Sequence, residues 1–218
     1  AIQRQLPVLD PIFNVQLHMS LPSTNETLMQ RQQQQSIHGQ VVLAEVQTMG
    51  RGRLGRQWQS PFGQNIALSL GWHFAGGAAA LEGLSLVVGL ALSQALADLG
   101  VQQVQLKWPN DVLVDGKKLA GILLEMRGDA AGPCHVVIGI GLNVHLIHDD
   151  VIDQPWVSLA QLGYHLSRND IVAQMLLRLS QYLHRFVQYG FAAVRDEWQQ
   201  CHYYQDQKVQ LLLPGKSI

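Results

Sequence analysis

The sequence is short of cysteine and of net charge, and each shortage argues against a class of protein. Its two cysteines, Cys134 and Cys201, share no short metal-binding or redox spacing and are too few for a disulfide framework. We therefore expect a reducing, cytoplasmic setting. The 15 basic and 16 acidic residues leave a net charge of −1. Because nucleic-acid-binding proteins usually carry a strong basic excess, this balance gives no support to that class.

Long apolar runs and several catalytic motifs are missing as well. No stretch reaches the roughly 18 to 20 uninterrupted apolar residues of a membrane span, and residues 1–10 lack the charged-then-apolar layout of a signal peptide. No G-x-S-x-G motif occurs, and the nine histidines form no H-E-x-x-H spacing. We therefore expect no membrane attachment, no hydrolase triad and no structural metal.

The chain does contain enough apolar residues for a buried core, since 47% are hydrophobic and only 14% are charged. A length of 218 residues fits one domain with the start of a second. Residues 79–99 are almost wholly apolar and end at Gly100, which predicts a buried helix. Strands are expected at 41–47, 65–72, 103–107, 111–114, 119–126 and 135–142.

Another helix is expected nearer the C-terminus. Ser167 with Asp170 has the pattern of a capping box. The apolar residues after it repeat with helical spacing and share one face: Ile171, Val172, Met175, Leu176, Leu179, Leu183 and Phe186. Residues 211–213 predict the first strand of a C-terminal module. The whole pattern indicates an α+β fold with a mixed β-sheet, one buried helix and a helical C-terminal part.

The densest chemical signal is the segment Gly50–Arg56, in which three of the fifteen basic residues fall within six positions and alternate with glycines. Glycine can adopt positive φ and turn backbone N–H groups inward around an anion. Arginine adds permanent charge and planar donors for carboxylate or phosphate. The alternative is a basic surface turn. A dinucleotide fingerprint also matches, but it requires a helix here, and residues 57–63 are loop-like.

Two further segments carry polar groups beside apolar strands. In Lys107–Asp111, Pro109 holds the preceding residue extended and directs Asn110 and Asp111. Lys118 directly precedes an apolar strand, where its ammonium can bind carboxylate or phosphate at the mouth of a pocket. The alternative for each lysine is an ordinary solvated surface position.

The segment 136–143 predicts a strand whose two faces differ. Alternation places Val136, Ile138, Ile140 and Leu142 on one face, and Val137, Gly139, Gly141 and Asn143 on the other. Two glycines on one face permit close approach by a ligand or another backbone. Tight packing of a helix on that face is an equally good interpretation.

Taken together, these segments resemble the catalytic domain of biotin protein ligases over residues 21–213. The matching motifs, in order, are Ser23-Thr24-Asn25, Gly50–Arg56, Ser60–Gly63, Lys107–Asp111, Lys118–Leu123 and Gly139–Asn143. The resemblance implies a mixed sheet like that of class II aminoacyl-tRNA synthetases in a catalytic domain at 1–206. It also implies the beginning of an SH3-like domain at 207–218, and a disordered biotin loop at about 45–63 that closes over the ligand.

The resemblance further implies the reaction. Biotin and ATP, with Mg²⁺, would form biotinyl-5′-AMP and pyrophosphate, and biotin would then pass to a lysine of the biotin carboxyl carrier protein of acetyl-CoA carboxylase. Lys118 and Arg53 are the expected catalytic residues. The expected biotin-binding residues are Ser23, Thr24, Asn25, Gln47, Arg51, Gly52, Arg53 and Lys118. Those expected for ATP and the adenylate are Arg51, Arg53, Arg56, Asn110, Lys118, Asn143 and Trp156, and Asp111 is a candidate Mg²⁺ ligand.

The chain departs from its relatives in two places, and two alternatives stay open. Leu54 stands where many relatives carry arginine. Only about twenty residues precede Ser23, too few for the helix-turn-helix of some bacterial members, so DNA binding is not expected if this N-terminus is genuine. A homodimer is left open. The alternatives are a lipoate or related acyl-protein ligase, which would lack the Gly-Arg-Gly-Arg loop, and a non-catalytic nucleotide- or DNA-binding regulator.

Overall fold

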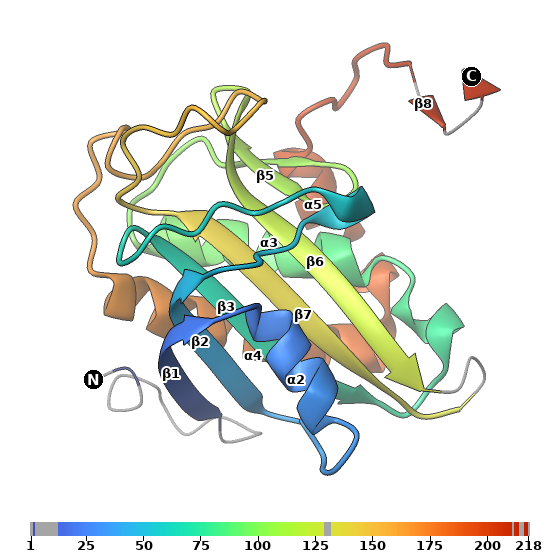
Figure 1. The fold of residues 1–218 in the computed structure, drawn as a ribbon. Coiled ribbons are helices and arrows are strands. Elements are labelled where there is room, and N and C mark those ends of the chain that lie inside the picture. Colours follow the sequence, from blue (N-terminus) through green and yellow to red (C-terminus); the bar gives the residue numbers. More distant parts are fainter. Residues whose placement is uncertain (1, 3–12, 129–131, 211, 214–215, 218) are drawn as a thin grey trace.

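The computed structural model describes residues 2, 13–128, 132–210, 212–213 and 216–217, and a seven-stranded mixed sheet lies at its centre (Figure 1). The strand order is β1-β2-β3-β7-β6-β5-β4. The strands are β1 (Asn14–Leu21), β2 (Gln40–Gln47), β3 (Asn65–Phe74), β4 (Gln105–Lys107), β5 (Asp111–Val114), β6 (Lys117–Gly128) and β7 (Cys134–Asn143). β1 and β2 are parallel, and the other neighbouring pairs are antiparallel. The six predicted strands are confirmed, and the half-exposed edge strand β1 is an addition to them.

Helices cover both faces of the sheet. α3 (Leu84–Asp98) and α4 (Arg168–Tyr189) pack on each other behind the sheet in Figure 1, with α5 (Arg195–Cys201) beside α3. The short helix α2 (Thr24–Arg31) crosses the opposite face. The predicted alternation in β7 is confirmed, because its four large apolar residues join the core under α3 and α4. The apolar face predicted for α4 is also confirmed, since all seven of its residues are buried.

Both predicted helix starts need correction. The segment 79–99 is a 3-10 turn (Ala78–Leu81) followed by α3, because Gly83 adopts a left-handed φ of 83° and interrupts the helix. Ser167 does precede α4, but its side chain makes no capping hydrogen bond, so the Ser167 half of the predicted capping box is wrong. The first residue of α4, Arg168, instead anchors the helix start to β2 through an ion pair with Glu45 at 2.8 Å.

The apolar character of the α3 region is explained by burial. By length and composition alone, the segment Ala78–Asp98 could cross a membrane. In the structure, ten of the fifteen residues of α3 are buried, and the helix packs on the sheet beside α4. Core packing therefore accounts for this composition without a membrane.

At the C-terminal end, β8 (Leu212–Leu213) pairs antiparallel with β9 (Lys216–Ser217). Residues 212–213 of the strand predicted at 211–213 are therefore a strand, and residue 211 lies outside the described residues. The domain division at 206/207 and the SH3-like module stay predictions.

Two buried glycines allow a matched test of the packing. A Cβ on Gly71 of β3 would lie 2.2 Å from the Ile37 carbonyl oxygen, whereas a Cβ on Gly89 of α3 would meet Leu106 and Ile122 at an ordinary 3.5 Å. We expect Gly71→Ala to lower the free energy of unfolding by about 1–3 kcal/mol through overpacking. Gly89→Ala should raise it by roughly 0.5–1 kcal/mol through helix propensity. Urea denaturation measures both changes, and equal effects would contradict the described packing.

An ion pair between α3 and α4 provides a test of pH dependence. Asp98 accepts hydrogen bonds from Arg178 at 2.6 and 2.8 Å, and this guanidinium holds the pKa of Asp98 below its usual value. Because the folded-state pKa is lowered, the stabilisation is present above the unfolded pKa of about 4 and is lost as pH falls through the folded value. Asp98→Asn should therefore reduce stability at pH 7, and its deficit should shrink on acidification. A deficit that is constant from pH 7 to 2.5 would rule out this linkage.

Candidate active site

A cavity of about 430 Å³ opens on the face of the sheet that carries α2. Its walls come from the start of α2, the end of β2, the arginine loop (residues 50–59), strands β5 to β7 and the segment 151–156. This volume is in the range of small-molecule sites. Every residue that the sequence analysis assigned to biotin, nucleotide or metal lines it: Ser23, Thr24, Asn25, Gln47, Arg51, Gly52, Arg53, Arg56, Asn110, Asp111, Lys118, Asn143 and Trp156.

The arginine loop folds as a narrow hairpin. Arg51 forms an isolated β-bridge with Gln57, and the Gly52 N–H donates to the Arg56 carbonyl oxygen at 2.7 Å. The tip is a 3-10 turn at Arg53–Gly55 in which Leu54 has a φ of 56°. No α-helix begins within residues 50–63, all of which are described, so the dinucleotide interpretation remains excluded. The range expected for the biotin loop, 45–63, also needs trimming, because residues 45–47 belong to β2.

The first two glycines of this loop do not have the predicted backbone conformation. Positive φ occurs at Leu54 and Gly55 rather than at Gly50 or Gly52, and Gly52 has a φ of −109°. At Gly50, a Cβ would lie 2.4 Å from the Trp58 carbonyl oxygen. Gly50 thus permits close approach of the two sides of the hairpin, and the positive charge of the loop comes from its arginine side chains.

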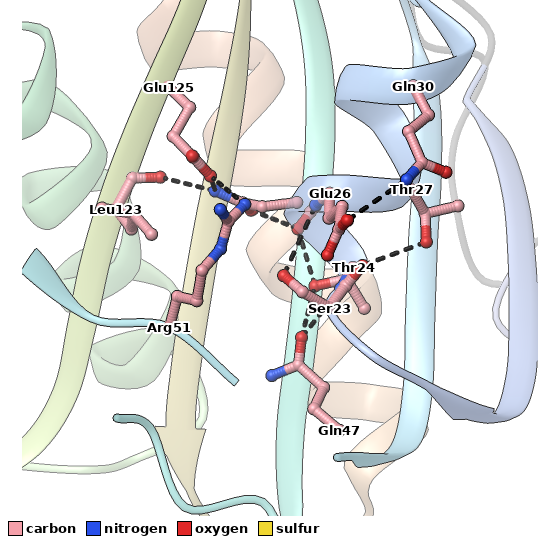
Figure 2. Close-up of polar contacts among 11 residues, drawn as sticks. Ser23, Thr24, Glu26, Thr27, Gln30, Gln47, Arg51, Leu123 and Glu125 are labelled. Carbon is pink, nitrogen blue, oxygen red and sulfur yellow. Dashed lines mark hydrogen bonds and ion pairs between the residues drawn. The ribbon is translucent and has the colours of Figure 1, made fainter. Parts of the chain in front are cut away.

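A cluster of polar side chains that hydrogen-bond to one another forms the inner end of the cavity (Figure 2). Gln47 Oε1 accepts hydrogen bonds from the Thr24 backbone N–H at 2.8 Å and the Thr24 hydroxyl at 3.0 Å. The Ser69 hydroxyl lies 2.7 Å from Thr24 Oγ1 and donates to Asn25 Oδ1 at 2.5 Å. Ser23 caps α2 by accepting from the Glu26 N–H at 3.4 Å. Ser23, Thr24, Asn25 and Ser69 are all at least 96% buried, so these groups are held in place before any ligand arrives.

Glycines on β6 and β7 form the floor. A Cβ on Gly139 would lie 2.2 Å from Asn25 Oδ1, and a Cβ on Gly141 would lie 2.3 Å from the Trp58 indole. At Gly121 the same indole would be 3.2 Å away. The helix-packing interpretation is confirmed at Gly139, over which α2 packs, whereas Gly141 is covered by a loop side chain. Close approach by a ligand stays a prediction.

Cationic side chains surround the outer part of the cavity. Two of them, Lys118 and Arg53, each contact one polar side chain. Lys118 Nζ lies 2.8 Å from Asp111 Oδ1, with 15% of the lysine side chain exposed. It also lies 5.8 Å from the centre of a Trp58 ring. Arg53 Nη1 donates to Asn110 Oδ1 at 2.9 Å. The solvated-surface alternative is therefore wrong for Lys118, because its neighbouring carboxylate offsets the cost of holding the ammonium in a mostly buried position.

Two residues expected at the nucleotide are connected through the backbone of segment 155–157. The Asn143 side-chain amide donates to the Val157 carbonyl oxygen at 3.2 Å. Lys118 exchanges backbone hydrogen bonds with this segment, donating to Pro155 O at 3.0 Å and accepting from Val157 N at 2.9 Å. Asn143 thus supports the segment, while Trp156 is half-buried and faces the cavity rather than the core.

The sequence analysis missed three residues of this region: Trp58, Ser69 and Glu125. Ser69 and Glu125 each lie in strands whose apolar pattern was recognised, but no local motif identifies a polar partner that is 44 or 100 positions away. Trp58 lies two positions after Arg56, so a bulky aromatic residue close behind the glycine- and arginine-rich segment was the available signal.

Comparison with known proteins agrees with this geometry. The model of the Biotin/lipoate A/B protein ligase family matches residues 17–143. The chain is 38% identical over 207 residues to the Bifunctional ligase/repressor BirA of Salmonella typhimurium, covering 94% of this chain and 64% of that protein. It is 37% identical over 164 residues to a Biotin--[acetyl-CoA-carboxylase] ligase of Paracoccus denitrificans, covering 72% of this chain and 68% of that protein.

A structural relative shows the same fold over most of the chain. The biotin protein ligase from Aquifex aeolicus in complex with biotin and ATP superimposes with a TM-score of 0.80 at 29% identity, covering 94% of this chain and 84% of that chain. The chain spans 62–64% of the length of the BirA relatives from Escherichia coli and Salmonella typhimurium. From these matches, the chain belongs to the biotin/lipoate A/B protein ligase family and, within it, to the biotin protein ligases.

Proposed function

We propose that the chain is an ATP-dependent biotin protein ligase that makes biotinyl-5′-AMP and then biotinylates a lysine of a biotin carboxyl carrier protein. The observation that carries the proposal is one cavity with a neutral, buried polar end and a cationic outer end. Biotin has the matching polarity, with a neutral ureido ring at one end and a carboxylate at the other. The Aquifex aeolicus relative with biotin and ATP supports this assignment.

The neutral end suits the ureido ring. Ser23, Thr24, Asn25 and Gln47 supply hydroxyl and amide groups that both donate and accept hydrogen bonds. Their mutual hydrogen bonds fix their orientations, so little ordering is required when the ligand binds. Gly139 leaves room for Asn25 directly against the strand.

The cationic end suits adenylation. A biotin carboxylate oxygen attacks the α-phosphorus of ATP, a P–O bond to biotin forms, and pyrophosphate leaves. Arg51, Arg53 and Lys118 offset the repulsion between the two anions and the charge that develops in the transition state. Arg56 would bind the leaving pyrophosphate. Glycine at 52 would allow the acyl phosphate to approach the loop backbone.

The nucleotide would lie against segment 151–156. Trp156 offers a half-buried aromatic face for adenine. Asn110 and Asn143 would act there, although their side-chain amides already donate to Ile122 O and Val157 O. The side-chain carbonyl oxygen of each asparagine therefore points away from that hydrogen bond. The Asn110 oxygen accepts a hydrogen bond from Arg53.

Mg²⁺ would enter with the ATP phosphates. No cluster of three His, Cys, Asp or Glu side chains suited to a metal exists among the described residues. Asp111 is a single carboxylate that already contacts Lys118. Because Mg²⁺ often binds through one carboxylate, substrate phosphates and water, Asp111 fits such a shared site. When bound, the ion would neutralise phosphate charge.

The second step needs orientation more than charge. The carrier lysine amine attacks the acyl carbon of the adenylate, an amide bond forms and AMP leaves. The arginine loop would cover the adenylate and exclude water until the carrier arrives. The carrier is expected to be that of acetyl-CoA carboxylase, as in the name of the Paracoccus denitrificans relative. We also expect a cytoplasmic enzyme, a sheet like that of class II aminoacyl-tRNA synthetases and an SH3-like module beginning at residue 207.

One assay separates the proposal from its rivals. Biotin-dependent ATP–pyrophosphate exchange is expected. Exchange that depends on lipoate instead would indicate a lipoate or related acyl-protein ligase, and exchange with neither acid would favour a non-catalytic regulator. The arginine-rich loop favours the biotin ligase, because the lipoate class is expected to lack it.

Lys118 and its neighbour Lys117 form a matched pair for testing catalysis. Lys118→Gln should slow biotin-dependent pyrophosphate exchange by at least tenfold, because it removes a cation from the reacting anions. Lys117→Gln, at an exposed position, should exchange at the parental rate. Thermal denaturation must show that both variants fold. A folded Lys118→Gln protein with normal exchange would exclude Lys118 from the reaction.

Arg53 tests retention of the intermediate. Arg53→Gly removes the hydrogen bond to Asn110 and one charge from the loop tip, while Arg51, Arg56 and Lys118 remain for adenylation. A charge-assisted hydrogen bond is worth roughly 1.5–3 kcal/mol, so the loop should open more often. We expect faster release of preformed biotinyl adenylate, and labelling of bystander proteins in a mixed lysate. Unchanged release would show that Arg53 does not hold the adenylate.

A further inference from the structure

Glu125 on β6 joins the two ends of the cavity through one carboxylate oxygen. Its Oε2 accepts a hydrogen bond from Asn25 Nδ2 at 2.8 Å. It also accepts one from Arg51 Nη2 at 3.1 Å (Figure 2). Asn25 belongs to the buried polar end, and Arg51 belongs to the arginine loop. Glu125 itself lines a neighbouring hollow, which shares Arg51 and Leu123 with the 430 Å³ cavity, and it is not among the residues that line that cavity. Its two partners, Asn25 and Arg51, do line the cavity.

The contact with Asn25 determines which way that amide faces. The Nδ2 group donates to Glu125 and, at 3.3 Å, to the Leu123 carbonyl oxygen. Its Oδ1 is consequently turned to the Ser69 hydroxyl. The Ser69 hydroxyl can donate or accept, so it is the two acceptors on the other side, Glu125 Oε2 and Leu123 O, that fix the orientation. A reversed amide would place its own oxygen against them. Glu125 thus holds one orientation of an amide that is 96% buried.

The contact with Arg51 orients a guanidinium that is otherwise exposed. Its side chain is 45% exposed, compared with 25% for Glu125. A guanidinium has five N–H donors in a rigid plane, so fixing Nη2 restricts the directions of the other four. Arg51 lines the cavity as well, and the remaining donors are available to an anion there.

We propose that Glu125 is a positioning residue for biotin binding: it orients Asn25 toward the ureido ring and Arg51 toward the carboxylate, without touching the ligand. This inference rests on the proposed ligase function. It assigns to Glu125 an effect on the capture of biotin rather than on the chemical step, because the reacting anions are also met by Arg53 and Lys118.

Substitutions can separate the contact of Glu125 with Asn25 from its contact with Arg51. In Glu125→Gln, the side-chain carbonyl oxygen can still accept from Asn25, but the anionic partner of Arg51 is lost. In Glu125→Ala, both contacts are lost. Both changes are made in the parent protein and in the Arg51→Met variant. Glu82→Gln, at an exposed position, controls for the loss of one negative charge. Pyrophosphate exchange is measured against biotin concentration at saturating ATP, after thermal denaturation has confirmed folding.

Glu125→Gln should raise the KM for biotin about twofold to fivefold, the range for a partly exposed charged pair, with kcat within about twofold of the parent. In Arg51→Met, Glu125→Gln should add nothing further, whereas Glu125→Ala should still raise KM through Asn25. An unchanged KM in Glu125→Gln, or a full additional increase in Arg51→Met, would overturn the inference while leaving the ligase assignment intact. Absence of exchange in the parent would instead overturn the proposed function, and this inference with it.

Discussion

The glycine face of β7 controls how closely other groups can approach the sheet at the site. Asn25 and the Trp58 indole occupy the space that a Cβ atom at residues 139 and 141 would need. A methyl group at residue 139 would have to displace the Asn25 side chain, and the contacts of that amide with Ser69 and Glu125 would be lost with it. Because Glu125 also holds Arg51, the arginine loop depends on the same close approach.

Polarity divides the cavity into two parts with different physical requirements. The inner part is neutral and almost fully buried, so its groups must satisfy one another before a ligand arrives. The outer part is cationic and partly exposed, and Arg51, Arg53 and Lys118 each have a partner there. Pairing holds these side chains in place, and the exposure of Arg51 and Arg53 keeps the energetic cost of exchanging their partners for a ligand anion small. This division is what suits the site to a molecule with one neutral and one anionic end.

Much of the fold could be predicted from local patterns. The alternation in β7, the apolar face of α4 and the long apolar segment ending at Gly100 each report a backbone period and burial on one side. The residues of the site could be named because the chain resembles biotin protein ligases in short motifs that carry them, and all of these residues line one cavity. Predictions that depended on the conformation of single residues were less successful, as at Ser167, Gly50 and Gly52.

The sequence by itself therefore determined six of the central strands, the two long helices and their buried faces, because these follow from spacings of a few residues. The segments that supply the cavity were named through the resemblance to biotin protein ligases. Only the tertiary structure decided which side chains meet. Ser69 reaches Asn25 across 44 positions and Glu125 reaches it across 100, through the register of β3, β6 and β7. Strand register is set by the packing of the whole sheet, so no local pattern contains these pairings.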